Sequence, residues 1–462
     1  MALRKWQAEC ANRAVDKYLS GQQHFFCLAT PGAGKTLMAA DVAKKLFAQS
    51  KIDFVVCFSP SIATAKGMQA TLEATIEASL NGQLGAKGTC VTYQSLNHKD
   101  NAFWNVFRQF RIFAIFDEIH HCGGNDINDA NVWAQHILAN VQSHAKYTMA
   151  LSGTPWRSDK RPVTLSSYCD QDGSIYCDYE YGLTEAISEN VCRIPHVTVI
   201  DNNQISVTSN EQTPEIYGSI KDVLQQTLIS YQAIVESDPI IEFCLEQANK
   251  ELRNVRSKNP KAAGLVVAST VEHAEKIAQK LKLKYSKSVE VVTYRNTESD
   301  SIISRFQNTN TEWLVSVGMV SEGTDIPRLQ VCCHLTRIKT ELHFRQILGR
   351  IMRLTHTDKS KRASLFAPAQ PQLIEFARRL LQDIPSQAAS IKIQTDPTTI
   401  NISEVAAVED ITPSETPQVT NVSTLSLIDD ESSYQDLPTL TETFLSGLGF
   451  DGQFSKHSIV NS

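Results

Sequence analysis

The chain has 462 residues, of which 42% are hydrophobic and 20% are charged, a composition typical of a soluble globular protein with two or three domains. Because no stretch approaches the roughly 18 consecutive apolar residues that span a bilayer, and the N-terminus lacks an apolar signal core, we expect a cytoplasmic protein that does not enter a membrane. The formal net charge is −6, but residues 385–462 carry 11 acidic and 2 basic side chains, so the rest of the chain is slightly positive and compatible with nucleic-acid contact along one groove.

The chain opens with an amphipathic helix predicted from Leu3 to about Leu19, and Gln7 lies on this helix. The amide of Gln7 offers one donor and one acceptor, the pair of groups that can read adenine. A solvated position on the helix face is the alternative. The sequence therefore makes Gln7 a candidate base-recognition residue.

A glycine-rich loop stands between a strand predicted at 24–28 and a helix predicted at 37–47. Its residues are Thr30, Pro31, Gly32, Ala33 and Gly34, followed by Lys35 and Thr36. Strand, glycine loop and helix form the context of a phosphate-binding loop, because glycines let backbone amides approach phosphate oxygens and a helix N-terminus favours anions. Lys35 can reach the β- and γ-phosphates, and the Thr36 hydroxyl can bind Mg²⁺. An ordinary turn before a helix is the alternative for this string alone.

An acidic pair follows one of the next strands. Strands are predicted at 54–58, from 89 and at 113–116, and the last of them ends in Asp117-Glu118-Ile119-His120. A carboxylate at the end of a strand can hold Mg²⁺ through water, and its neighbour can orient or deprotonate an attacking water. The pattern assigns Asp117 to the metal and Glu118 to the water.

The strand predicted at 147–151 leads into Ser152-Gly153-Thr154, whose hydroxyls can bond the acidic loop. Strands that alternate with helices up to this point predict an α/β fold with a parallel, doubly wound sheet. Ligands of such sheets collect at the carboxyl ends of the strands, where each motif so far falls.

A second α/β unit is predicted from Gly264 onward, after a polar loop at 202–214 and helical patterns to about residue 256. Its last helix carries Gln346, Gly349, Arg350 and Arg353. Gln346, Arg350 and Arg353 follow each other at helical spacing, so they are predicted to share one face. Two arginines on one face are strong phosphate ligands, and a solvated basic face is the alternative.

The composition changes after about residue 384, where Thr, Ser, Pro and acidic residues dominate. This tail is predicted to be largely flexible, although 437–454 holds enough apolar residues for a docking segment. The predicted organisation is therefore a nucleotide-binding domain, a helical connector, a second α/β domain and an acidic tail. Their ranges are 1–200, 201–255, 256–384 and 385–462.

The eleven cysteines show no paired spacing and are expected to be reduced core thiols. Neither His120-His121-Cys122 nor the pair Cys169 and Cys177 has a second ligand pair nearby, so no zinc site is predicted.

Taken together, these motifs resemble superfamily 2 helicases of the DExH type over about residues 3–354. The segments at 29–36, 117–120, 152–154, 316–327 and 346–353 match successive family motifs. Residues 152–157 and 321–327 are most similar to the branch that contains type I and type III restriction motor subunits and related repair helicases. No nuclease constellation is evident.

The resemblance implies two tandem RecA-like domains with ATP in the cleft between them. It implies that Lys35, Thr36 and Asp117 hold Mg-ATP and that Glu118 activates water. It assigns charge stabilisation at the γ-phosphate to Arg350 and Arg353, within the motif that begins at Gln346. Nucleotide and nucleic-acid binding are coupled, in the family, by the residues matching Gly323 and Asp325.

The implied activity is an ATP-dependent helicase or translocase, with DNA favoured over RNA, in repair, replication or restriction and phage defence. Such contacts are mainly to phosphates. A hypothesis of a different class is an ATP-gated nucleic-acid sensor or scaffold that recruits a protein partner through its acidic tail without unwinding.

Overall fold

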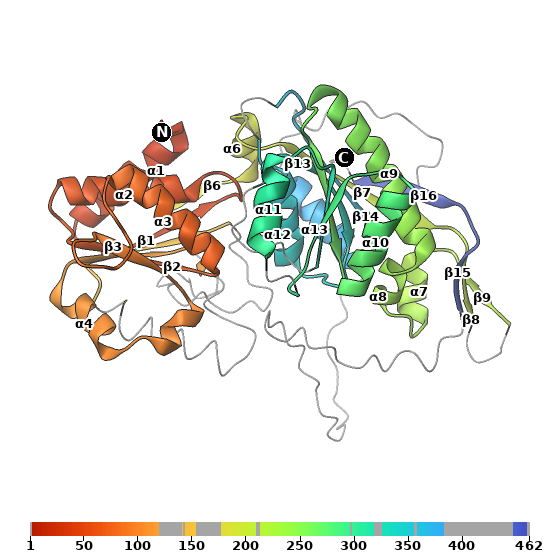
Figure 1. The fold of residues 1–462 in the computed structure, drawn as a ribbon, viewed down its shortest axis with the longest axis horizontal. Helices are drawn as coiled ribbons and strands as arrows, with labels where there is room; N and C mark the ends of the chain where they lie inside the picture. Colours follow the sequence, from red (N-terminus) through yellow and green to blue (C-terminus); the bar gives the residue numbers. More distant parts are fainter. Residues whose placement is uncertain are drawn as a thin grey trace, which may run out of the picture.

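The structure is a computed structural model, and it describes residues 2–119, 141, 144–153, 177–208, 213–295, 298–317, 326–354, 358–382 and 447–459. These residues form two α/β units, each around its own sheet, and one small antiparallel sheet (Figure 1). Seven residues singled out above lie outside the described residues, namely His120, His121, Cys122, Thr154, Cys169, Gly323 and Asp325. Within the described part of the chain, no helix is long and apolar enough to cross a membrane.

The first unit is a six-stranded parallel sheet in the order β3-β2-β4-β5-β1-β6. Its strands are β1 (His24–Ala29), β2 (Phe54–Ser59), β3 (Gly88–Thr92), β4 (Ile112–Phe116), β5 (Tyr147–Ser152) and β6 (Tyr179–Tyr181). The helices that connect them are α1 (Lys5–Leu19), α2 (Lys35–Ala48), α3 (Ile62–Ile76) and α4 (Asn101–Gln109), with a short 3₁₀ turn η1 (Gln94–His98). The predicted parallel sheet is confirmed.

Both faces of this sheet are covered, which explains why its central strands are continuous apolar runs. All residues of β4 and β5 are buried. Successive side chains point to opposite faces, so Phe25 packs in the core that includes α1 and α2, whereas Phe26 packs in the core that includes α4. Figure 1 shows α1, α2 and α3 on one side of the sheet and α4 on the other.

The second unit is a seven-stranded sheet in the order β11-β12-β10-β13-β14-β7-β16. Its strands are β7 (Ile194–Asn202), β10 (Ala263–Ala268), β11 (Val289–Val292), β12 (Trp313–Val317), β13 (Leu329–Leu335), β14 (Arg362–Pro368) and β16 (Phe454–Ile459). All pairs are parallel except that of β16 with β7. Its helices are α9 (Asp238–Lys258), α10 (Val271–Leu283), α11 (Ser299–Asn308), α12 (Glu341–Ile351) and α13 (Pro371–Gln382).

Three shorter helices and a small sheet complete the described chain. The helices are α6 (Leu183–Ser188), α7 (Ile220–Gln226) and α8 (Tyr231–Val235). The small sheet joins β8 (Ile205–Thr208) to β9 (Glu215–Tyr217) on one side and to β15 (Gly447–Phe450) on the other. The segment at 202–214, predicted as a loop, therefore contains a strand.

The sheet topology corrects the predicted domain boundaries. β7 begins before residue 200, yet it pairs along its length with β14 of the second sheet. α9, predicted as part of a connector, packs against β10, β13 and β14. The alternation of apolar residues in β7 is the same whichever sheet it joins, so the pattern alone cannot assign it.

Residues 447–459 of the predicted tail form two strands, which overlap the docking segment predicted at 437–454. β16 pairs antiparallel with β7 over six residues, from Phe454 with Asn202 to Ile459 with Val197. Its Phe454 ring stacks on Phe243 of α9, with ring centroids 4.8 Å apart. The strand satisfies backbone groups of β7 that an uncovered edge would expose, which is a reason for this segment to dock.

Candidate functional site

The glycine-rich loop lies at the carboxyl end of β1 and leads directly into α2, as predicted. Its start is anchored to β6, because the Thr30 amide donates to the Tyr181 carbonyl at 3.0 Å. Gly34 precedes the helix with a φ of 95°, in the left-handed region. A Cβ at this position would lie 2.6 Å from Nε2 of Gln7. Backbone conformation and close approach therefore both require glycine here.

Lys35 and Glu118 meet at the carboxyl edge of the first sheet. The Lys35 ammonium lies 2.9 Å from Oε1 of Glu118 and donates to the Ala29 carbonyl at 3.2 Å. The other carboxylate oxygen of Glu118 accepts from the Gly153 amide at 2.9 Å. Segments that follow β1, β4 and β5 thus converge on one ion pair. The structure brings together three motifs that lie far apart in the chain.

Asp117 and Thr36 supply the oxygen atoms predicted to bind a metal ion. Asp117 is buried, its amide donates to the Phe58 carbonyl at 2.9 Å, and its carbonyl accepts from the Tyr93 hydroxyl at 2.9 Å. Thr36 is the second residue of α2 and is half-buried. Mg²⁺ prefers oxygen ligands and usually takes only one or two from the protein, so these donors fit this ion.

Gln7 contacts the glycine-rich loop through its side chain. Its Nε2 donates to the Gly34 carbonyl at 2.8 Å, and its Oε1 accepts from the Arg4 amide at 2.8 Å. Arg4, which sequence reasoning missed, donates from Nη1 to the Ala33 carbonyl at 2.6 Å. The Gln7 amide retains a second N–H and a second oxygen lone pair, and its role in reading adenine stays a prediction. No sequence signal distinguishes Arg4 from other basic residues near a helix start.

The second unit reaches the glycine-rich loop through α12. A Cβ on Gly349 would lie 2.6 Å from Cβ of Pro31, so the helix backbone is in close contact with the loop. Gln346 and Arg350 are half-buried on this helix. Arg353 also reaches the loop, because its Cγ lies 3.0 Å from the position of a Cβ on Gly32.

The prediction that Gln346, Arg350 and Arg353 share one helical face is wrong for Arg353. α12 ends at Ile351, and Arg353 forms an antiparallel bridge with Cys192. The Met352 carbonyl accepts a hydrogen bond from the Arg193 amide at 2.6 Å, so the partner of this carbonyl lies outside the helix. Arg353 therefore approaches the loop from the extended segment that follows the helix.

Two buried histidines lie behind this part of the site. His334 of β13 and His343 of α12 have ring centroids 5.6 Å apart. Burial lowers the pKa of His334 to about 4. Burial also holds the pKa of His343 well below its ordinary value, and the nearby charges of His334 and Arg350 lower it further. Both rings are therefore neutral at physiological pH and act as packing groups.

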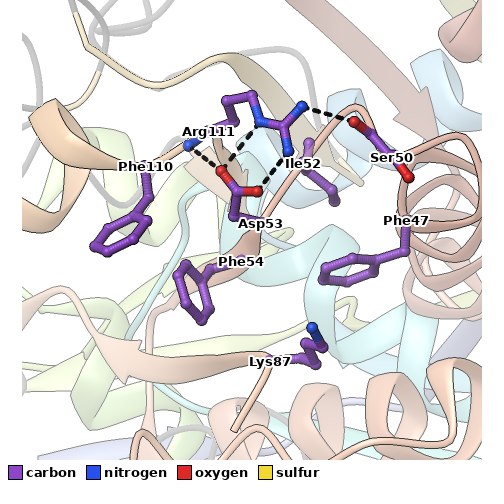
Figure 2. Close-up of a pocket in the computed structure, with 8 residues that line it drawn as sticks. All are labelled: Phe47, Ser50, Ile52, Asp53, Phe54, Lys87, Phe110 and Arg111. Carbon is purple, nitrogen blue, oxygen red and sulfur yellow. Dashed lines mark hydrogen bonds and ion pairs between the residues drawn. The ribbon is translucent and has the colours of Figure 1, made fainter. Parts of the chain in front are cut away.

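A hollow of about 400 Å³ lies at the other end of the first sheet, where β2 and β4 begin (Figure 2). Its apolar wall includes Phe54 and Phe110, whose rings meet edge to face at 5.2 Å. Asp53 and Arg111 close its rim with an ion pair of 2.5 Å, and hydrogen bonds from Arg111 lower the pKa of Asp53 to about 2. None of the predicted site residues that the structure describes lines this hollow.

Two family models match the chain. The model described as the res subunit of type III restriction enzymes matches residues 1–157, and the model described as the helicase conserved C-terminal domain matches residues 245–355. The first range contains the glycine-rich loop and the acidic pair. The second contains Gln346, Arg350 and Arg353.

Relatives and solved structures agree with these matches. An uncharacterized protein of Mycobacterium leprae is 30% identical over 393 residues, which cover 82% of this chain and 64% of that protein. The chain thus spans less than two thirds of this relative. The DNA 3′-5′ translocase XPB2 of Sulfurisphaera tokodaii is 24% identical over 382 residues, covering 76% of this chain and 78% of that protein.

A solved fragment described as an HsdR subunit of a type I restriction enzyme from Vibrio vulnificus has the same fold. Its TM-score is 0.54 at 18% identity, and the match covers 81% of this chain and 65% of the fragment. At this identity the likeness establishes the fold of two RecA-like units and nothing further.

Proposed function

Because the chain belongs to the superfamily 2 helicases and is related to restriction motor subunits, we propose that it is an ATP-driven translocase or helicase that acts on nucleic acid, with DNA favoured over RNA. The observation that carries this proposal is the contact of the second unit with the phosphate loop. Gly349 and Arg353 approach Pro31 and Gly32, so one nucleotide can touch both units. A motor requires this arrangement, because hydrolysis must change how two domains contact each other.

The residues of the first unit would bind and activate the nucleotide. A triphosphate in the loop would compete with Glu118 for the Lys35 ammonium, since the two side chains are paired at 2.9 Å. Release of Glu118 would leave a carboxylate beside the γ-phosphate position, where it can orient and deprotonate water. Thr36 and Asp117 would hold Mg²⁺, which neutralises phosphate charge when it is bound.

The residues of the second unit would stabilise charge that develops during hydrolysis. Arg353 lies against the phosphate loop, and Arg350 precedes it on α12. A guanidinium fork is suited to phosphate oxygens, and an arginine supplied from the opposite domain can contribute a large part of the rate. We assign Arg353 and Arg350 to this role, and Gln346 lies on α12 with Arg350.

The preference for DNA rests on the relative named as a DNA translocase. The test compares ATP hydrolysis with single- and double-stranded DNA and with single- and double-stranded RNA. Stronger stimulation by either form of DNA supports this preference, and stronger stimulation by RNA contradicts it.

Lys35→Ala is expected to reduce nucleic-acid-stimulated ATP hydrolysis by at least about 100-fold, because it removes the cation aimed at the phosphates. Lys44→Ala is the matched control, since Lys44 is exposed on the same helix. Turnover that is undiminished in Lys35→Ala would rule out this site.

The sensor or scaffold hypothesis is separated by a strand-displacement assay. Displacement of a paired strand by the isolated chain supports a helicase. Hydrolysis without displacement or movement along the strand, together with a protein partner captured through residues 385–462, supports a scaffold instead.

A further inference from the structure

Arg193 is a fully buried charged residue at the connection between the two units. It lies between α6, which follows the first sheet, and β7, which belongs to the second. Burying a guanidinium is costly unless its donors are satisfied, so the contacts of Arg193 indicate what the residue does.

The guanidinium of Arg193 donates hydrogen bonds to three backbone carbonyls and one carboxylate. Nη1 donates to Leu329 at 2.9 Å and to Ile351 at 2.8 Å, while Nη2 donates to Pro327 at 2.9 Å. Nη2 also pairs with Oδ2 of Asp358 at 2.5 Å. Oδ1 of Asp358 in turn accepts a hydrogen bond from Nδ2 of Asn259 at 3.4 Å. A residue that directly follows α9 therefore also holds the ion pair in place.

The Ile351 carbonyl is the contact that links Arg193 to the nucleotide site. Ile351 is the last residue of α12, and carbonyls at a helix end lack partners within the helix. A cation at this end also interacts favourably with the helix dipole. The side chain of Arg193 therefore caps the C-terminal end of α12.

The backbone around Arg193 then sets the path of the next residues. The Arg193 amide donates to the Met352 carbonyl at 2.6 Å, and its neighbour Cys192 pairs with Arg353. Arg353 leaves this short bridge with its Cγ near Gly32. The direction of the Arg353 side chain thus depends on the junction that Arg193 holds together.

We propose that Arg193 is a positioning residue, which fixes the end of α12 so that Arg353 lies against the phosphate loop. This inference rests on the proposed ATP hydrolysis. It assigns Arg193 no contact with nucleotide or nucleic acid. A lysine cannot reproduce its role, because an ammonium is a single point charge and cannot bridge four acceptors arranged around a planar fork.

The test uses the full chain and compares Arg193→Lys, Arg353→Ala and the double variant. Arg193→Lys is expected to lower kcat for ATP about 10- to 100-fold while KM changes less than about threefold, because an interaction made only in the transition state is weakened. Arg353→Ala is expected to lower kcat by about 1000-fold. The double variant is expected to match Arg353→Ala alone, because Arg193→Lys acts only through the position of the Arg353 guanidinium.

Arg256→Lys is the control for loss of a half-buried arginine in the same unit. Arg256 donates to the Ala262 carbonyl at 2.6 Å and to Asn310 at 3.1 Å, and neither acceptor belongs to the site. It should retain the wild-type kcat. Circular dichroism and thermal unfolding establish that each variant is folded. If Arg193→Lys does not fold, Asp358→Asn replaces it, with a smaller fall in kcat expected at unchanged KM.

Two results would overturn the inference. The first is a wild-type kcat in folded Arg193→Lys, or in Asp358→Asn where that variant replaces it. The second is a double variant in which the fall in kcat equals the product of the falls in the two single variants. Failure of the proposed function looks different, because then the wild-type chain hydrolyses no ATP or Lys35→Ala hydrolyses it at the wild-type rate.

Discussion

Glu118 shows how a single residue can be held in an unfavourable conformation by its contacts. Its φ is 48°, in the left-handed region that residues with a Cβ rarely adopt. The Lys35 ammonium and the Gly153 amide both bind its carboxylate, and they compensate for the backbone strain. Strain of this kind concentrates where a side chain must point in one direction. At Glu118 that direction is toward the ammonium group of Lys35.

Gly34→Ala is predicted to damage both stability and nucleotide binding. The positive φ alone costs a residue with a Cβ about 1–2 kcal/mol, and the new methyl group would displace the amide of Gln7. Urea unfolding and ATP hydrolysis measure the two effects. Gly67→Ala is the control, because Gly67 lies within α3 and a Cβ there meets nothing within 4 Å. That variant should be more stable than wild type by about 0.5–1 kcal/mol, and equal effects of the two changes would contradict the prediction.

At the scale of elements, the packing of α12 on β13 decides where the second unit presents its arginines. His334 and His343 lie in this contact, and His273 of α10 is buried in the same unit. Burial lowers the pKa of His273 to about 4, as it does for His334. All three rings enter the fold in their neutral form. Acid should therefore loosen the element that carries Gln346 and Arg350.

The free energy of unfolding is predicted to fall as pH is lowered from about 6.5 toward 4. In this window the unfolded chain binds protons at these histidines and the folded chain does not, so each contributes up to about 1.4 kcal/mol per pH unit. Above about pH 7.5 these histidines are neutral in both states and their contribution to the slope disappears. Urea unfolding at several pH values measures the slope.

His334→Gln removes one titrating ring from the core and should reduce this slope. His98→Gln is the matched control, because His98 is exposed in the 3₁₀ turn η1 and folding does not bury its ring. Identical slopes in wild type and His334→Gln would show that His334 does not contribute to the acid sensitivity.

At the scale of the whole molecule, two strands far apart in the sequence complete the second sheet. One follows α6 directly and the other lies in the C-terminal region. β7 enters the sheet first, and β16 from the C-terminal region closes the edge beside it. β15 likewise pairs with β8, so two strands near the C-terminus add to two strands that precede α9 (Figure 1). The stability of the second unit therefore depends on residues 447–459.

A chain that ends at Ser446 is predicted to be less stable and more prone to associate. Loss of β16 uncovers the edge of β7 and the ring of Phe243, and a cost of about 2 kcal/mol would lower Tm by about 4 °C or more. An uncovered edge also invites pairing between molecules. Thermal unfolding and light scattering measure the two effects. A chain that ends at Ile459 is the control, and equal Tm values for both chains would contradict the prediction.

The sequence by itself determined the local elements and most of the candidate site. Lys35 and Glu118 could be recognised because each stands at a fixed place relative to one strand, and short-range order follows from local periodicity and turn chemistry. Only the tertiary structure decided which sheet β7 joins, that residues 447–459 return to cover it, and that Arg353 leaves the helical face. These features depend on pairing between segments far apart in the chain. The side-chain periodicity of one segment does not identify the distant segment with which it pairs.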